Sequence, residues 1–197
     1  LPTRTHGIVI ASAAALRQRL CPQTHLDKYG IHLAIGDRLA RDALIQRLID
    51  AGYQRNAHHI SGKGEYAARG NIVDLYPMNA ADPIRLEWFD DSIDSIRTFA
   101  VADQRTLEKL SSISILPRSE LDLSDAGRTC YRQNARLHYG EKITSSPLYR
   151  QISDGQTPQG LEYYLPLFYD DTATLFDYLP PNSLHLACDD LPALLEQ

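Results

Sequence analysis

Cysteine is scarce in this chain of 197 residues. Its three cysteines, Cys21, Cys130 and Cys188, lie far apart, and no CxxC pair occurs. A zinc ribbon needs paired cysteines and a disulfide framework needs an even set, so the sequence argues against both. Isolated cysteines are typical of reduced thiols, which predicts a cytoplasmic protein. The only histidine doublet, His58-His59, has no cysteine or carboxylate at ligand spacing. We therefore expect surface histidines near a turn and no metal site.

Long apolar runs and an excess of positive charge are also absent. The apolar stretch "GIVIASAAAL" near the start is too short to cross a bilayer, and no signal-peptide pattern surrounds it, so we expect no membrane contact. The net charge of −5 argues against sequence-independent binding of nucleic acid, although it leaves room for a local basic patch. The sequence has no initiator methionine and opens directly onto a strand-like segment, so we expect a piece of a longer chain.

The glycine-rich stretch "ISGKGEYAARGNIVDLYP" (60–77) lacks the spacing of a nucleotide loop. A phosphate loop reads G-x-x-x-x-G-K-[ST], but no glycine stands five residues before Gly62, and Gly64 replaces the Ser/Thr. The kinase-type pattern fails because Ala67 stands where its third glycine belongs. There is no G-x-S-x-G elbow and no cysteine in an activating context, and Asp90-Asp91 indicates a turn. We expect no catalytic residue and no cofactor, and hence no enzyme.

Helical periodicity occurs on both sides of the central region. Residues 12–20 predict a helix that Ser12 caps and Pro22 ends, and 40–51 predict another, with Leu44, Ile45, Leu48 and Ile49 on one face and Gly52 at its C-terminus. Residues 122–139 predict a third helix, capped near Ser124. Apolar runs at 7–11 and near 184–188 predict buried strands, and 31–35 is a further short apolar stretch.

Between Glu65 and Phe99 the periodicity changes to two, which predicts strands at 65–69, 71–76, 84–89 and 93–99. The fold class is therefore α/β (α+β), with a small mixed or antiparallel sheet and packed helices. In "IRLEWF" (84–89) the alternation separates two faces. Ile84, Leu86 and Trp88 share one face, and Arg85, Glu87 and Phe89 share the other.

Phe89 is an aromatic residue on the polar face of its strand. It lies about 13 Å along the strand from Arg85, and Arg69 belongs to the same sheet, just before Gly70, which lets the chain bend. Exposed aromatics flanked by arginines are typical of protein-docking surfaces. Two interpretations stay open: a docking surface, or Phe89 tucked under a loop beside an ordinary salt-bridge lattice of Arg69, Arg85 and Glu87.

A basic stripe of Arg128, Arg132 and Arg136 recurs every four residues along the helix expected at 122–139. Such a stripe is typical of a solvated helix face. A DNA-binding module that uses these three arginines is the alternative.

The longest motifs resemble a known family. "GEYAARGNIVDLYP", "IRLEWFDDSIDSIRTF" and "DQRTLEKLSSISILPRSE" closely resemble the UvrB-homology region of the bacterial transcription-repair coupling factors. "QGLEYYLPLFYDDTATLFDYLP" and "GIVIASAAALRQRLCP" resemble two segments of the first UvrB-like domain. "DQRTLEKL" favours the coupling factors over UvrB itself, whose equivalent domain is the alternative. Asp90-Asp91-Ser92 departs from the usual Gly-Asp-Glu, which alters the turn.

The resemblance implies a division into domains and a partner. Residues 1–27 and 118–197 would be the end of the first segment and the second segment of UvrB-like domain 1, a P-loop-helicase-like domain that here lacks its phosphate loop. Residues 28–117 would be UvrB-like domain 2, which docks onto the excision-repair protein UvrA. The family's contact residues fall on Arg69, Arg85 and Phe89, with Gly70 and Glu87 in support. We expect alanine at each of the three contact positions to weaken binding sharply with little change in thermal stability.

The resemblance also implies what lies elsewhere in the family's full-length proteins. ATP and magnesium belong to a translocase motor outside these residues, so this part should not hydrolyse ATP. RNA polymerase and double-stranded DNA are bound by other domains. A C-terminal domain is expected to cover the UvrA-docking face until the protein is activated.

Overall fold

The computed structural model describes residues 7–187, which separate into two compact units. One unit is His25–Ser119, and the other combines the described parts of 1–24 and 120–197. The divisions fall at 24/25 and 119/120, compared with 27/28 and 117/118 in the sequence-based division. The assignment of the two outer segments to a helicase-like domain stays a prediction.

The central unit contains two sheets. The first is six-stranded, in the order β2-β3-β4-β5-β6-β7, with β2 parallel to β3 and all other neighbours antiparallel. Its strands are β2 (Gln54–Arg55), β3 (Glu65–Arg69), β4 (Ile72–Leu75), β5 (Ile84–Phe89), β6 (Ser92–Phe99) and β7 (Thr106–Leu110). The second pairs β1 (Ile31–Ala34) with β8 (Ser112–Ile115) in antiparallel fashion. The mixed α/β class predicted from the sequence is confirmed.

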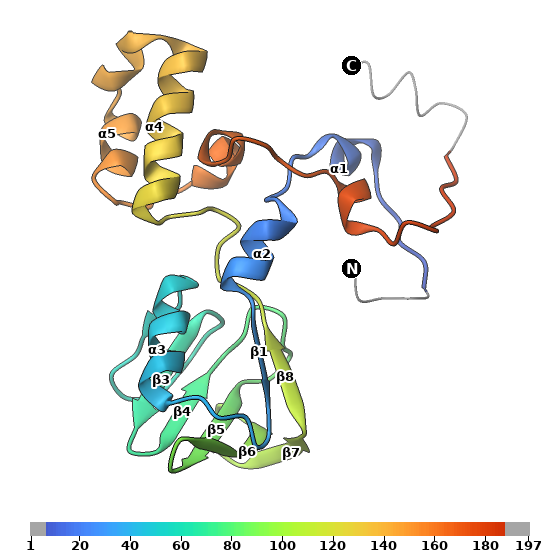
Figure 1. Cartoon of the computed structure of the whole chain (residues 1–197), viewed down its shortest axis with the longest axis vertical. Helices are drawn as coiled ribbons and strands as arrows, with labels where there is room; N and C mark the ends of the chain where they lie inside the picture. Colours follow the sequence, from blue (N-terminus) through green and yellow to red (C-terminus); the bar gives the residue numbers. More distant parts are fainter. Residues whose placement is uncertain (1–6, 188–197) are drawn as a thin grey trace. The chain divides into compact units, whose positions relative to one another are not determined.

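The main core of this unit lies on one face of the six-stranded sheet, and a smaller buried cluster of Ile60, Ala67 and Phe99 packs on the other. Figure 1 shows helix α3 (Arg41–Asp50) and the β1–β8 pair lying over that sheet. Ile84, Leu86 and Trp88 of β5 are buried in this core, as the alternation in "IRLEWF" predicts. The opposite, outer face therefore carries Arg85, Glu87 and Phe89.

Helix α3 forms where the helical periodicity predicts it. Leu44 and Leu48, one turn apart, are fully buried in the core. Ile49 is 48% exposed, so the prediction that it shares the buried face with Leu44 and Leu48 is wrong. The reason is that the apolar positions 44, 45, 48 and 49 together span more of the helix circumference than the sheet covers. Gly52 follows the C-terminus with a φ of +85°, and its N–H donates to the carbonyl of Ile49.

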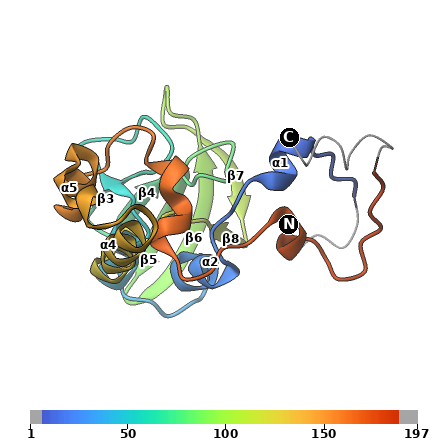
Figure 2. The ribbon, with the colours of Figure 1, turned by 90° about the horizontal axis from the view of Figure 1, so that it is seen from above.

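The other unit is helical in the residues that the structure describes. Helices α4 (Asp125–Tyr139) and α5 (Pro147–Ser153) lie side by side in both Figure 1 and Figure 2. Ser124 caps α4, as predicted, because its hydroxyl accepts the N–H of Gly127. The shorter elements are α1 (Ala13–Arg17), η1 (Glu141–Ser145), η2 (Leu161–Phe168) and η3 (Leu175–Tyr178). Helix α2 (Gln23–Tyr29) crosses the boundary between the units.

Two strand predictions in the helical unit are wrong. Residues 7–11 form no strand, and Ile8 and Ile10 are 90% and 93% exposed. Leu184 and Leu186 are also exposed, and the predicted strand near 184–188 does not form up to residue 187; Cys188 lies outside the described residues. A strand needs a neighbour to satisfy its backbone groups, and no described residue pairs with either segment.

The first helix is shorter than predicted. Ser12 caps α1 through the N–H of Ala15, but the helix ends at Arg17, well before Pro22. Gln18 already has an extended backbone (ψ 132°). Leu20 instead forms an antiparallel bridge with Ala173, which draws the chain out of the helix.

Candidate protein-docking surface

The outer face of the six-stranded sheet gathers charged side chains from four neighbouring strands. The register pairs Asp74 of β4 with Arg85 of β5, and Arg85 with Arg97 of β6. Directly paired residues share a face of an antiparallel sheet, so these side chains are neighbours. Arg69 reaches the same group from the end of β3, two positions beyond the residue that pairs with Asp74.

Asp74 is the centre of this group. Its side chain is buried, with 1% of the residue exposed, and it accepts three hydrogen bonds. Arg69 donates one from Nη2 at 2.8 Å, and Arg85 donates two, from Nε at 2.6 Å and from Nη2 at 2.9 Å. The hydrogen bonds to Asp74 also raise the pKa of Arg85. Since one carboxylate faces two guanidinium groups, the cluster keeps a net positive charge.

Arg85 is held on several sides. Beyond Asp74, its Nη2 donates to Oε1 of Gln104 at 2.9 Å, and its guanidinium lies 4.6 Å from the centre of the Phe99 ring. Only 16% of its side chain is exposed. Arg85 is therefore fixed by its own chain, which limits the number of donors it can offer to a partner.

Arg69 is the more accessible arginine. Its side chain is 53% exposed, and its single hydrogen bond within the described residues is the one to Asp74. The remaining donors of this guanidinium are open to solvent, in a geometry suited to a carboxylate. Of the two predicted arginines, Arg69 is the one that the fold presents.

Glu87 belongs to a separate ion pair. Its carboxylate accepts from Arg97, the residue that pairs with Arg85 across the strands, and from the hydroxyl of Ser95 at 3.0 Å. Each of the two facing arginines thus has its own carboxylate, which removes the repulsion between like charges. The interpretation as a salt-bridge lattice assigned the wrong acidic residue to Arg69 and Arg85. The carboxylate between these two arginines is that of Asp74, and not that of Glu87.

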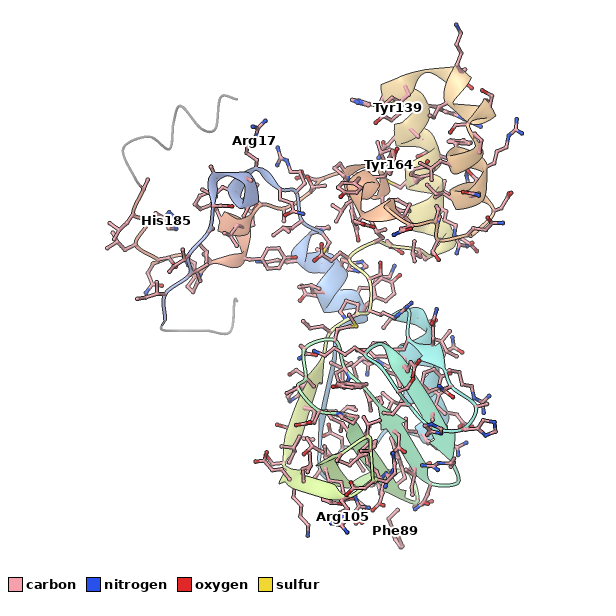
Figure 3. All side chains as sticks on the ribbon, turned by 180° about the vertical axis from the view of Figure 1, so that it is seen from behind. Arg17, Phe89, Arg105, Tyr139, Tyr164 and His185 are labelled. Carbon is pink, nitrogen blue, oxygen red and sulfur yellow. The ribbon has the colours of Figure 1, made fainter. Side chains whose placement is uncertain are left out.

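Phe89 stands at the end of β5 and is 78% exposed. Figure 3 shows its ring projecting outward from the sheet, so it is not tucked under a loop. The backbone beneath it is firmly held: the Trp88 indole donates to the carbonyl of Leu39 at 2.7 Å, and the Leu39 N–H donates to Asp91. An exposed aromatic ring on a fixed backbone can bind without costly ordering.

Two short turns present these side chains. Gly70 has a φ of +56° in the two-residue turn that joins β3 to β4, immediately after Arg69. Asp90 has the same φ of +56° in the β5–β6 turn, immediately after Phe89, where the family pattern has glycine. Aspartate tolerates this left-handed backbone better than most residues, so the altered turn is preserved.

The glycine-rich loop before β3 binds a carboxylate of its own chain. Glu65 accepts from the N–H of Ser61 at 2.8 Å, from the Ser61 hydroxyl at 3.1 Å and from the N–H of Gly62 at 3.3 Å. Lys63 donates to the carbonyl of Met78. The loop therefore serves as a turn into the sheet, as its failure to match a phosphate loop suggests.

These contacts lower the pKa of Glu65, mainly through the backbone N–H of Ser61. A carboxylate whose pKa is lower in the folded state stabilises the fold above its ordinary pKa, and this contribution is lost as the pH falls through the folded value. We expect Glu65→Gln to flatten the loss of stability below pH 4.5. Urea unfolding at several pH values measures this. If the urea midpoint of the variant fell with pH as much as that of the wild type, the loop would not bind the carboxylate.

The basic stripe on α4 lies in the other unit, and its arginines have partners in their own chain. Arg128 pairs with Asp125 at 3.4 Å, and Arg132 donates to the Thr129 hydroxyl at 2.8 Å. Arg136 lies 3.9 Å from Glu141. This geometry suits a solvated helix face, and the DNA-binding alternative stays a prediction.

The structure thus brings Arg69 and Arg85 together through Asp74 and places Phe89 at the far end of β5 on the same face. Sequence reasoning missed Asp74 and Gln104. In "NIVDLYP" the alternation of Val73, Asp74 and Leu75 was a usable signal, because an aspartate between two buried apolar residues must face the outer side. Gln104 lies in a loop, where no periodicity applies.

Within residues 7–187 neither a metal site nor a membrane-spanning helix is found. Within the described residues no group of three or more His, Cys, Asp or Glu side chains is placed to hold a metal ion. In the same part of the chain no helix is both long and apolar enough to cross a membrane.

Comparisons with known proteins match both the central unit and nearly the whole chain. Residues 31–121 match the family model described as the UvrB interaction domain. Transcription-repair-coupling factors of Haemophilus influenzae and Escherichia coli are 46% identical over 180 residues and 39% identical over 198 residues, covering 90% and 100% of this chain. That of Bacillus subtilis is 34% identical over 203 residues, covering 96%. The chain spans 16–17% of the length of these relatives.

Proposed function

Since this chain belongs to the transcription-repair-coupling factor family, of which it spans about a sixth, we propose that its central unit recruits the excision-repair protein UvrA. The outer face of the six-stranded sheet is the docking surface, and it includes Arg69, Arg85 and Phe89. Docking would link a stalled RNA polymerase to nucleotide excision repair. The observation that carries the proposal is the exposed Phe89 on the same face as the arginine cluster.

The match to the UvrB interaction domain supports this proposal, because residues 31–121 include all three docking residues. The chemistry of the face supports it as well. Aromatic and arginine side chains dominate binding free energies at protein interfaces, and here both are attached to regular strands rather than to loops.

The three residues have different roles in the proposed docking. Arg69 supplies charge-assisted hydrogen bonds to acidic groups of UvrA, since its donors are the accessible ones. Phe89 is the apolar anchor. Arg85 acts mainly as a positioning residue that holds Asp74, against which Arg69 is oriented. Gly70 presents Arg69 through its turn, and Glu87 neutralises Arg97 beside the cluster.

We propose further that this region is non-enzymatic and works in the cytoplasm. It would bind neither ATP nor magnesium, which would belong to the motor of the full-length relatives. RNA polymerase and double-stranded DNA would be partners of other domains, and a C-terminal domain would cover the docking face before activation.

Arg69→Ala tests the proposed docking. We expect the dissociation constant of the complex with purified UvrA to rise at least tenfold, as for an interface arginine that contributes about 1.4 kcal/mol or more. Stability should change little, because Asp74 keeps both of its hydrogen bonds from Arg85. Isothermal titration calorimetry measures the affinity, and urea unfolding measures the stability.

Arg47→Ala is the matched control, because Arg47 is an exposed arginine of the same unit on α3, the helix that covers the opposite face of the sheet. It should bind UvrA like the wild type. Equal affinities for the wild type and the Arg69 variant would exclude Arg69 from the interface, and no binding by the wild type would refute the proposed function.

A further inference from the structure

An open pocket of about 550 Å³ adjoins the docking face. It lies between the loop before β3 and the loop before β7, and Arg69 forms part of its wall. The other lining residues are Ala57, His58, His59, Val101, Ala102 and Gln104. The pocket is as large as those that hold drug-sized ligands, so it has room for the tip of a loop.

The charge of the pocket suits an anion. Arg69 and Arg85 together carry two positive charges against the single carboxylate of Asp74, and Arg69 is the member of this cluster that reaches the pocket. Among the described residues no aspartate or glutamate lines it, and Asp103 of the adjoining loop is paired with Arg105. The two histidines offer further ring N–H donors, while Val101 and the two alanines offer an apolar wall.

Gln104 ties the pocket to the arginine cluster. It is one of two non-glycine residues with a positive φ in the described part of the chain, at +62°. In this backbone conformation its side chain accepts from Arg85 at 2.9 Å and donates to the carbonyl of Val101 at 3.1 Å. Residues in a sparsely populated backbone conformation cluster at binding sites, and Gln104 is such a residue between Arg85 and the pocket wall. The 101–104 loop is thereby held against Arg85 as the outer wall of the pocket.

We propose that this pocket receives an acidic loop of the docked partner, whose carboxylate binds Arg69 between His58 and His59. The inference rests on the proposed function and deepens it: the partner of the docking surface must carry an exposed aspartate or glutamate on a protruding loop. Val101 and Ala102 pack against the aliphatic part of that loop. Phe89, at the other end of β5, makes a second and independent contact.

The test fills the pocket without removing a charge. Ala102→Trp places an indole in the pocket from an exposed position of the 101–104 loop, and Ala57→Trp does so from the opposite wall. The control Ala81→Trp adds the same bulk at an exposed alanine outside the pocket. Each variant of the full chain is titrated with purified UvrA by calorimetry, after circular dichroism has shown that it is folded. Because two filling variants are used, the test remains decisive if one of them does not fold.

We expect both filling variants to bind UvrA at least tenfold more weakly and the Ala81 variant to bind within twofold of the wild type. Adding Arg69→Ala to Ala102→Trp should cause little further loss, because both changes remove the same contact. His58→Ser with His59→Ser should weaken binding by a smaller factor. UvrA itself can be varied, with asparagine for aspartate or glutamine for glutamate. At least one such UvrA variant should bind the wild-type chain weakly, and its affinity should not fall further when the chain carries Arg69→Ala.

Other outcomes overturn the inference. If Phe89→Ala weakens binding while the filling variants bind like the wild type, the pocket is not used and the proposed docking function stands. Full additivity of Arg69→Ala and Ala102→Trp would show that Arg69 binds outside the pocket. If wild-type chain does not bind UvrA, the proposed function fails, and this inference fails with it.

Discussion

Replacing Arg85 with alanine is expected to destabilise the central unit by about 3 kcal/mol. Arg85 supplies two of the three hydrogen bonds to Asp74, and a carboxylate that is 1% exposed cannot regain them from water. Breaking a buried ion pair by removing one partner typically costs about 3–5 kcal/mol, and Arg69 keeps the cost at the lower end by retaining its bond. Urea unfolding followed by Trp88 fluorescence measures the loss.

The matched comparison replaces the whole pair. Arg85→Met combined with Asp74→Leu removes both buried charges at similar volume, and such replacements are often neutral or stabilising. The double variant should therefore be more stable than Arg85→Ala alone. A loss below about 0.5 kcal/mol for Arg85→Ala, which is ordinary for a surface position, would show that Asp74 does not depend on it.

This result would revise one sequence-based expectation. The sequence suggested that alanine at position 85 would change binding and leave thermal stability almost unaltered. The hydrogen bonds to Asp74 show why the two effects cannot be separated at this position. Weaker UvrA binding by an Arg85 variant is therefore informative only beside a measured stability.

Phe89→Ala is expected to weaken UvrA binding about thirtyfold or more, which corresponds to about 2 kcal/mol for an aromatic anchor. Its free energy of unfolding should change by less than about 0.5 kcal/mol, because the ring is 78% exposed and buries little surface in its own chain. Calorimetric titration and urea unfolding measure the two quantities on the same sample.

Leu107→Ala is the control for loss of exposed apolar surface. Leu107 is 54% exposed on β7, which pairs with the end of β6 far from Phe89. Its variant should bind normally. Normal binding by the Phe89 variant would remove the anchor from the docking surface, and unfolding of that variant would mean that the ring is packed in solution.

The sequence predicted strands β3 to β6 and helix α3 of the central unit, but it did not predict β8 and marked β1 only as a short apolar stretch. In β5 one side is buried and the other is half-buried or exposed, so the alternation of Ile84, Leu86 and Trp88 with Arg85 and Glu87 gives the faces directly. Edge strands β2 and β7 were not predicted, because neither has a buried face: their residues are almost all exposed. Hydrophobic periodicity cannot predict a strand that has no buried face.

The candidate site was only partly predictable. Parity placed Arg85 and Phe89 on the outer face, but the ion pairs depend on the register between strands, which pairs Asp74 with Arg85 and Glu87 with Ser95. A single sequence does not give that register. The pocket beside Arg69 depends on two loops, so nothing in the periodicity of the chain could have indicated it.

Burial of Asp74 beneath the docking face has a kinetic consequence. Long arginine side chains usually lose rotamer freedom when a complex forms, which costs about 0.5–1.5 kcal/mol for each side chain. For Arg85 this loss occurs during folding, since Asp74, Gln104 and the Phe99 ring already fix its guanidinium. At Arg85 and Asp74 a partner therefore meets a preorganised part of the face, so rearrangement of these two side chains should not limit its association rate.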